Sequence, residues 1–222
     1  MSKKTGARPP ELAPWQLAAI DAVAAQPLAQ ELVFGGGAAL AAIHLHHRTS
    51  EDVDFFAMRE IARTELAPLA RALATTTVRV DAEVVGPRTS LVLQRRSRPF
   101  GRIDFAFYPF DPIGRRTKWR GLTVESLVDM TVNKVQAVLS RQQPRDLVDL
   151  YFLLQEGPER DLERLLDLCR SKFDVGAHPM GLAQRLLLVH EAKQLPRMIR
   201  PLDLAELVRF FDARASELVP GR

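Results

Sequence analysis

The sequence predicts an α+β protein in which a mixed β-sheet core with flanking helices is followed by a helical C-terminal part. In the first half, strand-like runs first alternate with helical patterns and then follow one another, which is typical of an α+β sheet domain. From about residue 122 onward, the periodic segments have helical spacing. We therefore predict a sheet core over residues 1–121 and a helical domain over residues 122–222.

The composition indicates a globular protein and excludes several other classes. Of 222 residues, 46% are hydrophobic, and 31 Lys and Arg against 27 Asp and Glu give a net charge of +4, which is not the composition of a disordered chain. The single cysteine, Cys169, excludes a disulfide framework and a cysteine-based metal centre. Because the sequence contains no long apolar run and its charged start does not resemble a secretory signal, we expect a cytoplasmic protein that is not bound to a membrane.

The first half contains the expected strands. Residues 11–31 have helical spacing that Pro27 interrupts, and an apolar run at 32–34 stops at three glycines. A helix is expected over 38–47, a strand over 52–56, and a helix over 59–74 in which Pro68 marks the start or an interruption. Turn residues at 86–87 and 98–101 then separate three expected strands, at 76–85, 90–95 and 102–110.

The second half is expected to be helical throughout. Thr123 is a candidate N-cap for a helix that continues to Arg141. Pro144 suits the first turn of a second helix that ends near Gln155. Three further helices are expected over 159–173, 181–195 and 203–218.

A glycine run precedes a pair of acidic residues in the first half. Backbone amides at Gly35, Gly36 and Gly37 could approach a phosphate closely, although the same residues also suit an ordinary tight turn. Asp52 and Asp54 are two residues apart in the expected strand, so their carboxylates share a face and repel each other unless a cation lies between them. Mg²⁺ is suited to such a pair, whereas the ordinary alternative is a solvated strand face.

Other charged residues allow two interpretations. Asp104 lies in an apolar strand, where it could complete a three-carboxylate cluster or pair with Arg95 or Arg102. Lys134 and Arg141 lie on nearly the same helical face and could hold a triphosphate, or they could simply be solvated. In the next helix, Asp146 could simply stabilise the positive end of the helix dipole at the N-terminus, and Asp149 could form a salt bridge with Arg145.

Two segments together resemble the AbiEii/AbiGii-type toxins of the DNA polymerase beta-like nucleotidyltransferase superfamily. The first, FGGGAALAAIHLHHRTSEDVDFF (34–56), is similar to that family's pattern of an apolar strand, two glycines, a helix and Ser-Glu-Asp-x-Asp-Phe. The second, DMTVNKVQAVLSRQQPRDLVDLYFLL (129–154), is similar to its pattern of Lys, Ala and Arg followed by Arg-Asp-x-x-Asp-Leu.

The resemblance implies a metal-dependent nucleotidyltransferase that transfers a nucleoside monophosphate from a nucleoside triphosphate to RNA, such as tRNA, or to a protein. It also implies that the chain is the toxin of a toxin–antitoxin pair and has an antitoxin protein as a partner. One departure is Ala38, which stands where many relatives in the superfamily have a hydroxyl residue. The implied site comprises Gly36, Gly37 and Arg141 at the nucleotide, Asp52, Asp54 and Asp104 at Mg²⁺, Lys134 at the phosphates, and Asp146 as a further active-site residue. Asp104 matches the third acid of the superfamily, which helps activate the attacking hydroxyl.

Two other functions fit parts of the sequence. Basic clusters at 95–98 and 115–120, the second with Trp119, favour a catalytically degenerate fold that binds nucleic acid or a partner protein, but they also suit an enzyme with an RNA acceptor. The retained acids and Lys134 favour the enzyme. His44, His46 and His47 raise the alternative of a transition-metal hydrolase; because only the first and last share a helical face, we expect a partly exposed helix end instead.

Overall fold

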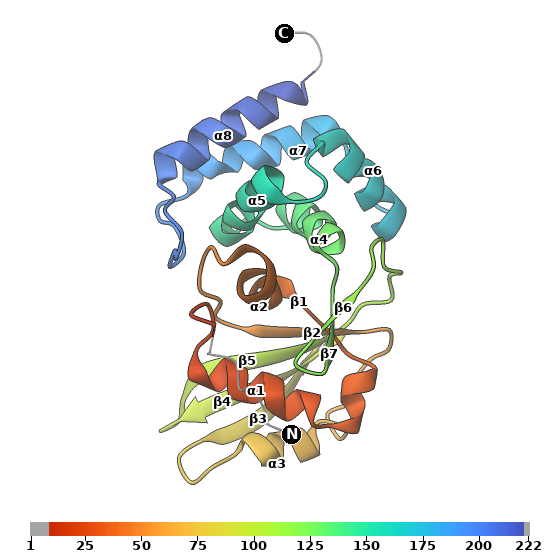
Figure 1. Cartoon of the computed structure of the whole chain (residues 1–222), viewed down its shortest axis with the longest axis vertical. Helices are drawn as coiled ribbons and strands as arrows, with labels where there is room; N and C mark the ends of the chain where they lie inside the picture. The colour runs from red at the N-terminus through yellow and green to blue at the C-terminus, as the bar shows by residue number, and fades with distance from the viewer. Residues whose placement is uncertain (1–8, 220–222) are drawn as a thin grey trace, which may run out of the picture. The chain divides into compact units, whose positions relative to one another are not determined.

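The structure is a computed structural model, and it describes residues 9–219. The chain divides into two compact units, which Figure 1 shows in one view. The sheet unit contains the described residues up to His44, together with Thr49–Pro109 and Thr117–Val124. The helical unit contains Leu45–Arg48, Phe110–Arg116 and the described residues from Glu125 onward. These units confirm the α+β class, while separate domains at 1–121 and 122–222 stay a prediction.

A mixed seven-stranded sheet forms the centre of the sheet unit, with the strand order β3-β4-β5-β2-β1-β7-β6 (Figure 1). The β2–β5 and β1–β7 pairs are parallel, and the other neighbouring pairs are antiparallel. The strands are β1 (Val33–Gly35), β2 (Val53–Ala57), β3 (Arg79–Val85), β4 (Arg88–Arg95), β5 (Arg98–Phe107), β6 (Thr117–Trp119) and β7 (Leu122–Val124).

An aromatic row crosses one face of this sheet. Phe34 of β1 lies opposite Phe55 of β2, which lies opposite Phe105 of β5, and the ring centroids are 5.5 Å apart at both steps. All three rings are buried. Helix α1 (Pro14–Ala24) packs on the same face, because Trp15 lies against Gly101, which is four residues before Phe105 in β5. The row is therefore part of the core beneath α1.

The other helices of the sheet unit are short. Residues 36–45 form α2 (Gly36–Ala39) and a π-helical turn (Leu40–Leu45), so the expected helix is present but begins within the glycine run, two residues earlier than predicted. The helix expected over 59–74 is limited to α3 (Ala67–Leu73), with Pro68 in its first turn. Its expected first half is wrong because Arg59 pairs with Glu65, and Glu65 accepts a hydrogen bond from the Ala62 backbone N–H, which stabilises a turn. A 3₁₀-helix, Pro27–Gln30, follows α1.

Helices dominate the helical unit, as the sequence predicted. Thr123, however, caps no helix: it lies in β7, and α4 begins four residues later, where the Ser126 hydroxyl accepts a hydrogen bond from the Asp129 N–H. Among residues 9–219, no helix is both long and apolar enough to cross a membrane. The helices are α4 (Leu127–Ser140), α5 (Pro144–Glu156), α6 (Leu162–Phe173), α7 (Pro179–Leu186), a 3₁₀-helix (Leu187–Glu191) and α8 (Leu204–Glu217).

A buried carboxylate attaches the 110–116 loop to the helical unit. Asp129 accepts hydrogen bonds from the backbone N–H groups of Ile113 and Gly114 at 2.9 and 3.0 Å, and from the Lys172 ammonium at 2.6 Å. Nearby, burial raises the pKa of Glu125 to about 7. The loop is therefore held by side chains of α4 and α6.

Removing one ring of the aromatic row tests how much the core depends on it. We expect Phe55→Ala to lower the free energy of unfolding by about 3–5 kcal/mol, because it leaves a cavity between two buried rings. Val84→Ala, at a residue that is 60% exposed on β3, should change it by less than about 0.5 kcal/mol. Urea denaturation measures both; a loss near 1 kcal/mol for Phe55→Ala would show that the row is not a core element.

Candidate active site

A polar row crosses the sheet on the face opposite the aromatic row. Strand register places Ser90 of β4 beside Asp104 of β5, Asp104 beside Asp54 of β2, and Asp54 beside Gly35 of β1. Neighbouring strands are about 4.8 Å apart, so residues paired in this way have adjacent side chains. The fold thus brings two of the predicted acids together at the glycine turn.

Asp104 is fixed by neighbours on β4. The Ser90 hydroxyl donates a hydrogen bond to its Oδ1 at 2.5 Å, and the Arg88 Nη1 atom lies 3.4 Å from its Oδ2. The arginine beside Asp104 is therefore Arg88; neither of the two that the sequence suggested is its partner, since Arg102 pairs with Glu83 and Arg95 lies over a phenylalanine ring. Asp104 is buried, with 7% of its surface exposed, so its carboxylate has a defined orientation.

The backbone of Gly36, which has no side chain, packs closely against the Asp54 carboxylate. Its φ of +65° is in the left-handed region that favours glycine. A Cβ atom at this position would collide with Asp54 Oδ2 and lie 2.7 Å from Asp54 Cγ. The glycine is required both by its backbone conformation and by the carboxylate that packs on it, while the adjacent Gly37 continues into α2.

Asp52 lies in a bend just before β2, so the strand begins one residue later than predicted. The side-chain amide of Gln16, which is fully buried in α1, donates hydrogen bonds to the backbone carbonyls of Ser50 and Asp52 at 3.1 and 3.2 Å. Asp52 and Asp54 are both half-buried. In the part of the chain that the structure describes, no three His, Cys, Asp or Glu side chains form a ready-made metal centre.

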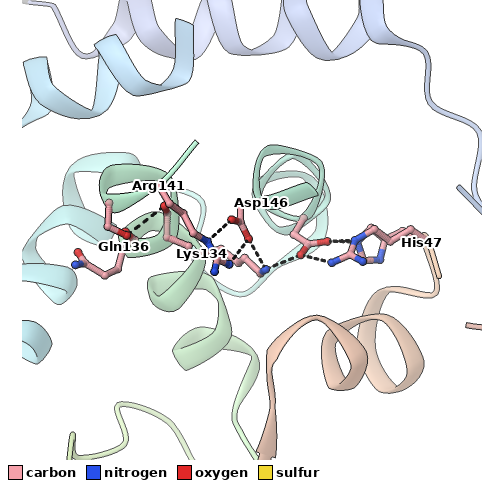
Figure 2. Close-up of polar contacts among 9 residues, drawn as sticks. His47, Lys134, Gln136, Arg141 and Asp146 are labelled. Carbon is pink, nitrogen blue, oxygen red and sulfur yellow. Dashed lines mark hydrogen bonds and ion pairs between the residues drawn. The ribbon is translucent and has the colours of Figure 1, made fainter. Parts of the chain in front are cut away.

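The other predicted site residues form a buried ionic network within the helical unit (Figure 2). Lys134 of α4 donates to Asp146 and Asp149 of α5, at 2.8 and 2.7 Å. Arg141 donates to both oxygens of Asp146, from Nε to Oδ2 at 2.7 Å and from Nη2 to Oδ1 at 3.1 Å. Lys134 is buried and is not part of a solvated helix face, because carboxylates at positions i and i+3 of α5 point toward it.

Asp149 is the centre of this network, a role that the sequence reasoning missed. Arg48 binds both of its oxygens, at 2.6 and 2.7 Å, and His47 Nε2 lies 2.7 Å from Oδ1. The expected pairing of Asp149 with Arg145 is therefore replaced by partners about 100 residues away. The signal available in the sequence was an acid at i+3 from Asp146 between apolar residues, which indicates a buried helix face.

The charges of the network explain its titration. Burial alone would raise the pKa of Asp149, but Lys134 and Arg48 hold it well below its usual value. Burial opposes the charged form of Lys134, yet Asp149 and Asp146 raise its pKa above the usual value. Burial lowers the pKa of His47, outweighing the effect of Asp149, and no group among residues 9–219 hydrogen-bonds to its Nδ1. His47 is therefore neutral.

A hollow of about 160 Å³ opens beside Arg141 in the helical unit. Arg185 and Gln143 contribute to its polar lining, and Val138 and Leu147 to its apolar lining. Arg141 is half exposed, so one guanidinium both contacts the buried network and faces a space that a ligand can enter.

Comparisons with known proteins give one family and one fold. The family model described as "Nucleotidyl transferase AbiEii toxin, Type IV TA system" matches residues 19–219. A crystal structure from H. pylori that carries a provisional nucleotidyltransferase assignment is similar to this chain, with a TM-score of 0.60, 18% identity, and coverage of 92% of this chain and 91% of that one. The structure of JHP933 from Helicobacter pylori has a TM-score of 0.58, 19% identity, and coverage of 92% and 88%. Among curated proteins, none matches.

Two glycines with positive φ allow a matched test of the contact with Asp54. Alanine at either position should cost about 1–2 kcal/mol through backbone strain alone. Gly86→Ala should cost no more, because nothing lies within 4 Å of the added Cβ. Gly36→Ala should cost clearly more, since it also displaces the Asp54 carboxylate. Equal losses in the free energy of unfolding would contradict the close contact.

The neutral His47 predicts a stability change at mildly acidic pH. Because its pKa is lower in the folded than in the unfolded protein, His47 should contribute a loss of stability as the pH drops below about 6.5, by at most about 1.4 kcal/mol per pH unit, while Glu125, with its pKa raised to about 7, contributes a change of opposite sign. Relative to wild type, His47→Gln should therefore lose less stability, or gain more, between pH 7 and pH 5, whereas His178→Gln, at an exposed residue, should follow wild type. Urea denaturation between pH 7 and pH 5 measures the slope; an unchanged slope in His47→Gln would contradict the assignment.

Proposed function

The chain belongs to the AbiEii family of nucleotidyl transferase toxins of type IV toxin–antitoxin systems and is a nucleotidyltransferase, and we propose that it transfers a nucleoside monophosphate from a nucleoside triphosphate to RNA, such as tRNA, in a metal-dependent reaction. The observation that carries this proposal is the register of the sheet. It aligns Asp54 with Asp104 and places Gly36 against the Asp54 carboxylate.

The aligned carboxylates fit Mg²⁺. This ion prefers one or two protein carboxylates, with water and substrate phosphates completing its shell, so a site with few protein ligands is the expected form. Asp54 and Asp104 would hold it, with Asp52 contributing from the bend that precedes β2. When bound, Mg²⁺ supplies positive charge that neutralises the triphosphate and the developing charge of the reaction.

The residues of the sheet unit then have separate tasks. Gly36 and Gly37 would let triphosphate oxygens approach their backbone, because no side chain is in the way. The hydroxyl oxygen of the acceptor attacks the α-phosphorus, its proton passes to Asp104, and the bond to the leaving pyrophosphate breaks. Ser90 orients Asp104 for this step through its hydrogen bond to Oδ1.

For the helical unit, we propose that Lys134 and Arg141 contact phosphate oxygens and that Asp146 positions both cations. The half-exposed Arg141 guanidinium supports this role, because a guanidinium is suited to binding phosphate oxygens. The hollow beside Arg141 gives a ligand access to that guanidinium. An antitoxin protein that restrains the enzyme, and a cytoplasmic location with access to nucleotides, complete the proposal.

Label transfer tests the function and the role of Asp54. The protein is incubated with each α-³²P-labelled nucleoside triphosphate, Mg²⁺ and total RNA, and we expect the label in RNA. Asp54→Asn should reduce transfer by about 100-fold or more but should not lower the free energy of unfolding, because it relieves repulsion between adjacent carboxylates. Asp167→Asn, at an exposed residue of α6, is the matched control and should transfer normally.

Four outcomes would contradict the proposal. Absence of label in any acceptor would remove the activity proposed for this chain. Label on protein alone would replace RNA as the acceptor. Undiminished transfer by Asp54→Asn, or full transfer in the presence of EDTA, would contradict the assignment of a metal-dependent site at Asp54.

A further inference from the structure

A basic groove lies at one end of the β4–β5 hairpin, in the sheet unit. Its volume is about 1050 Å³. Arg95, Arg96 and Arg98 line it, together with Thr76 and Thr77 from the segment before β3, and Pro99 and Phe100 from β5. All three arginines are exposed, and the lining contains no acidic residue. The groove therefore presents a concentrated positive charge.

The backbone of this hairpin holds like charges together. Arg96 and Ser97 have φ values of +50° and +59°, the left-handed conformation that two-residue hairpin turns require and that Asn and Gly usually supply. Arg95 and Arg98 are direct cross-strand partners, and like charges in such pairs destabilise a sheet. The turn thus combines unfavourable backbone conformations with unfavourable charges.

These charges are not neutralised within residues 9–219, where none of the three arginines forms an ion pair with a carboxylate. Other arginines of the same sheet are paired: Arg79 binds Asp81 at 2.8 Å, and Arg102 lies 3.6 Å from Glu83. The contrast indicates that the groove, rather than the whole sheet, is suited to an external anion.

An aromatic platform positions one of the cations. The Arg95 guanidinium lies over the Phe100 ring, 5.0 Å from its centroid, and Trp15 packs edge-on against Phe100 at 6.1 Å. A guanidinium held over a ring in this way can donate to phosphate oxygens and can stack with a nucleobase. Among the residues that line the groove, Pro99 and Phe100 are the apolar ones, and the others are arginines and threonines.

From these observations we infer that the groove binds the phosphate backbone of the acceptor RNA, outside the residues that carry out the transfer. The inference rests on the proposed function for the identity of the ligand as RNA. Cations that follow a strand, next to an aromatic platform, are the usual features of proteins that hold single-stranded nucleic acid. The groove would hold the RNA while its hydroxyl reacts elsewhere.

Binding without nucleotide or metal tests the groove separately from the chemistry. The probe is a fluorescent single-stranded RNA of about 20 nucleotides, longer than one groove can cover, and the readout is its anisotropy at several salt concentrations. Arg95→Gln/Arg96→Gln/Arg98→Gln should weaken binding by about 10-fold or more at about 100 mM salt. It should also reduce the slope of log K against log salt by about 2, which corresponds to three lost phosphate contacts.

Two matched variants separate the groove from net charge and folding. Arg63→Gln/Arg164→Gln/Arg209→Gln removes the same charge at exposed positions and should bind within about twofold of wild type. Replacing the three groove arginines by Lys keeps the charge and should recover most of the binding. Wild-type affinity in the groove Gln variant, or an equal loss in the control, would overturn the inference.

Two further measurements separate an RNA ligand from an acidic protein, and binding in the groove from the transfer reaction. If the groove Gln variant keeps its RNA affinity but loses binding to poly-L-glutamate, an acidic protein occupies the groove and the inference is wrong. If wild type binds RNA through the groove but transfers no label, the proposed function is wrong, while the inference that the groove binds RNA is kept. If transfer to RNA occurs and the groove variant binds RNA normally, only the groove is rejected.

Discussion

The register between β1, β2 and β5 is the constraint on which the site depends. One row across these strands consists of buried phenylalanines, and the next row, one residue away on the opposite face, contains Asp54 and Asp104. A slip by one residue would exchange the faces, burying the carboxylates beneath α1 and exposing the rings. The apolar core therefore fixes which side chains meet at the glycine turn, and packing energy and site geometry come from the same pairing.

The two groups of acids illustrate different ways of keeping carboxylates in a folded protein. On the sheet, Asp54 and Asp104 lie beside each other, and Asp104 also accepts a hydrogen bond from the Ser90 hydroxyl and lies 3.4 Å from the Arg88 guanidinium. In the helical unit, Asp146 and Asp149 are compensated by Lys134, Arg48 and Arg141 within the protein. Breaking such a buried pair typically costs about 3–5 kcal/mol, so residues there influence stability whatever else they do.

Much of the fold could be predicted because its signals are local. Short windows of sequence show the glycine run at the start of α2, the strand around Phe55, the hairpin turn after Val85 and the start of α5 at Pro144. Strands β6 and β7 were not predicted, since three residues are too few to show a period. The partners of Asp149 could not be predicted from the sequence either, because tertiary contacts rather than spacing along the helix determine them.

The path of the chain has a further consequence for how the molecule can be divided. His47 and Arg48 lie in a four-residue segment of the helical unit that is embedded in the sequence of the sheet unit. A fragment starting at residue 122 would retain Lys134 but lack the imidazole and the guanidinium that bind Asp149, leaving a fully buried anion poorly compensated. Synthesis on the ribosome has the converse difficulty, because that segment emerges about 100 residues before its carboxylate does. The C-terminal helices are thus not expected to fold as an isolated fragment. Their final packing requires both the segment at residues 45–48 and the later residues of the chain.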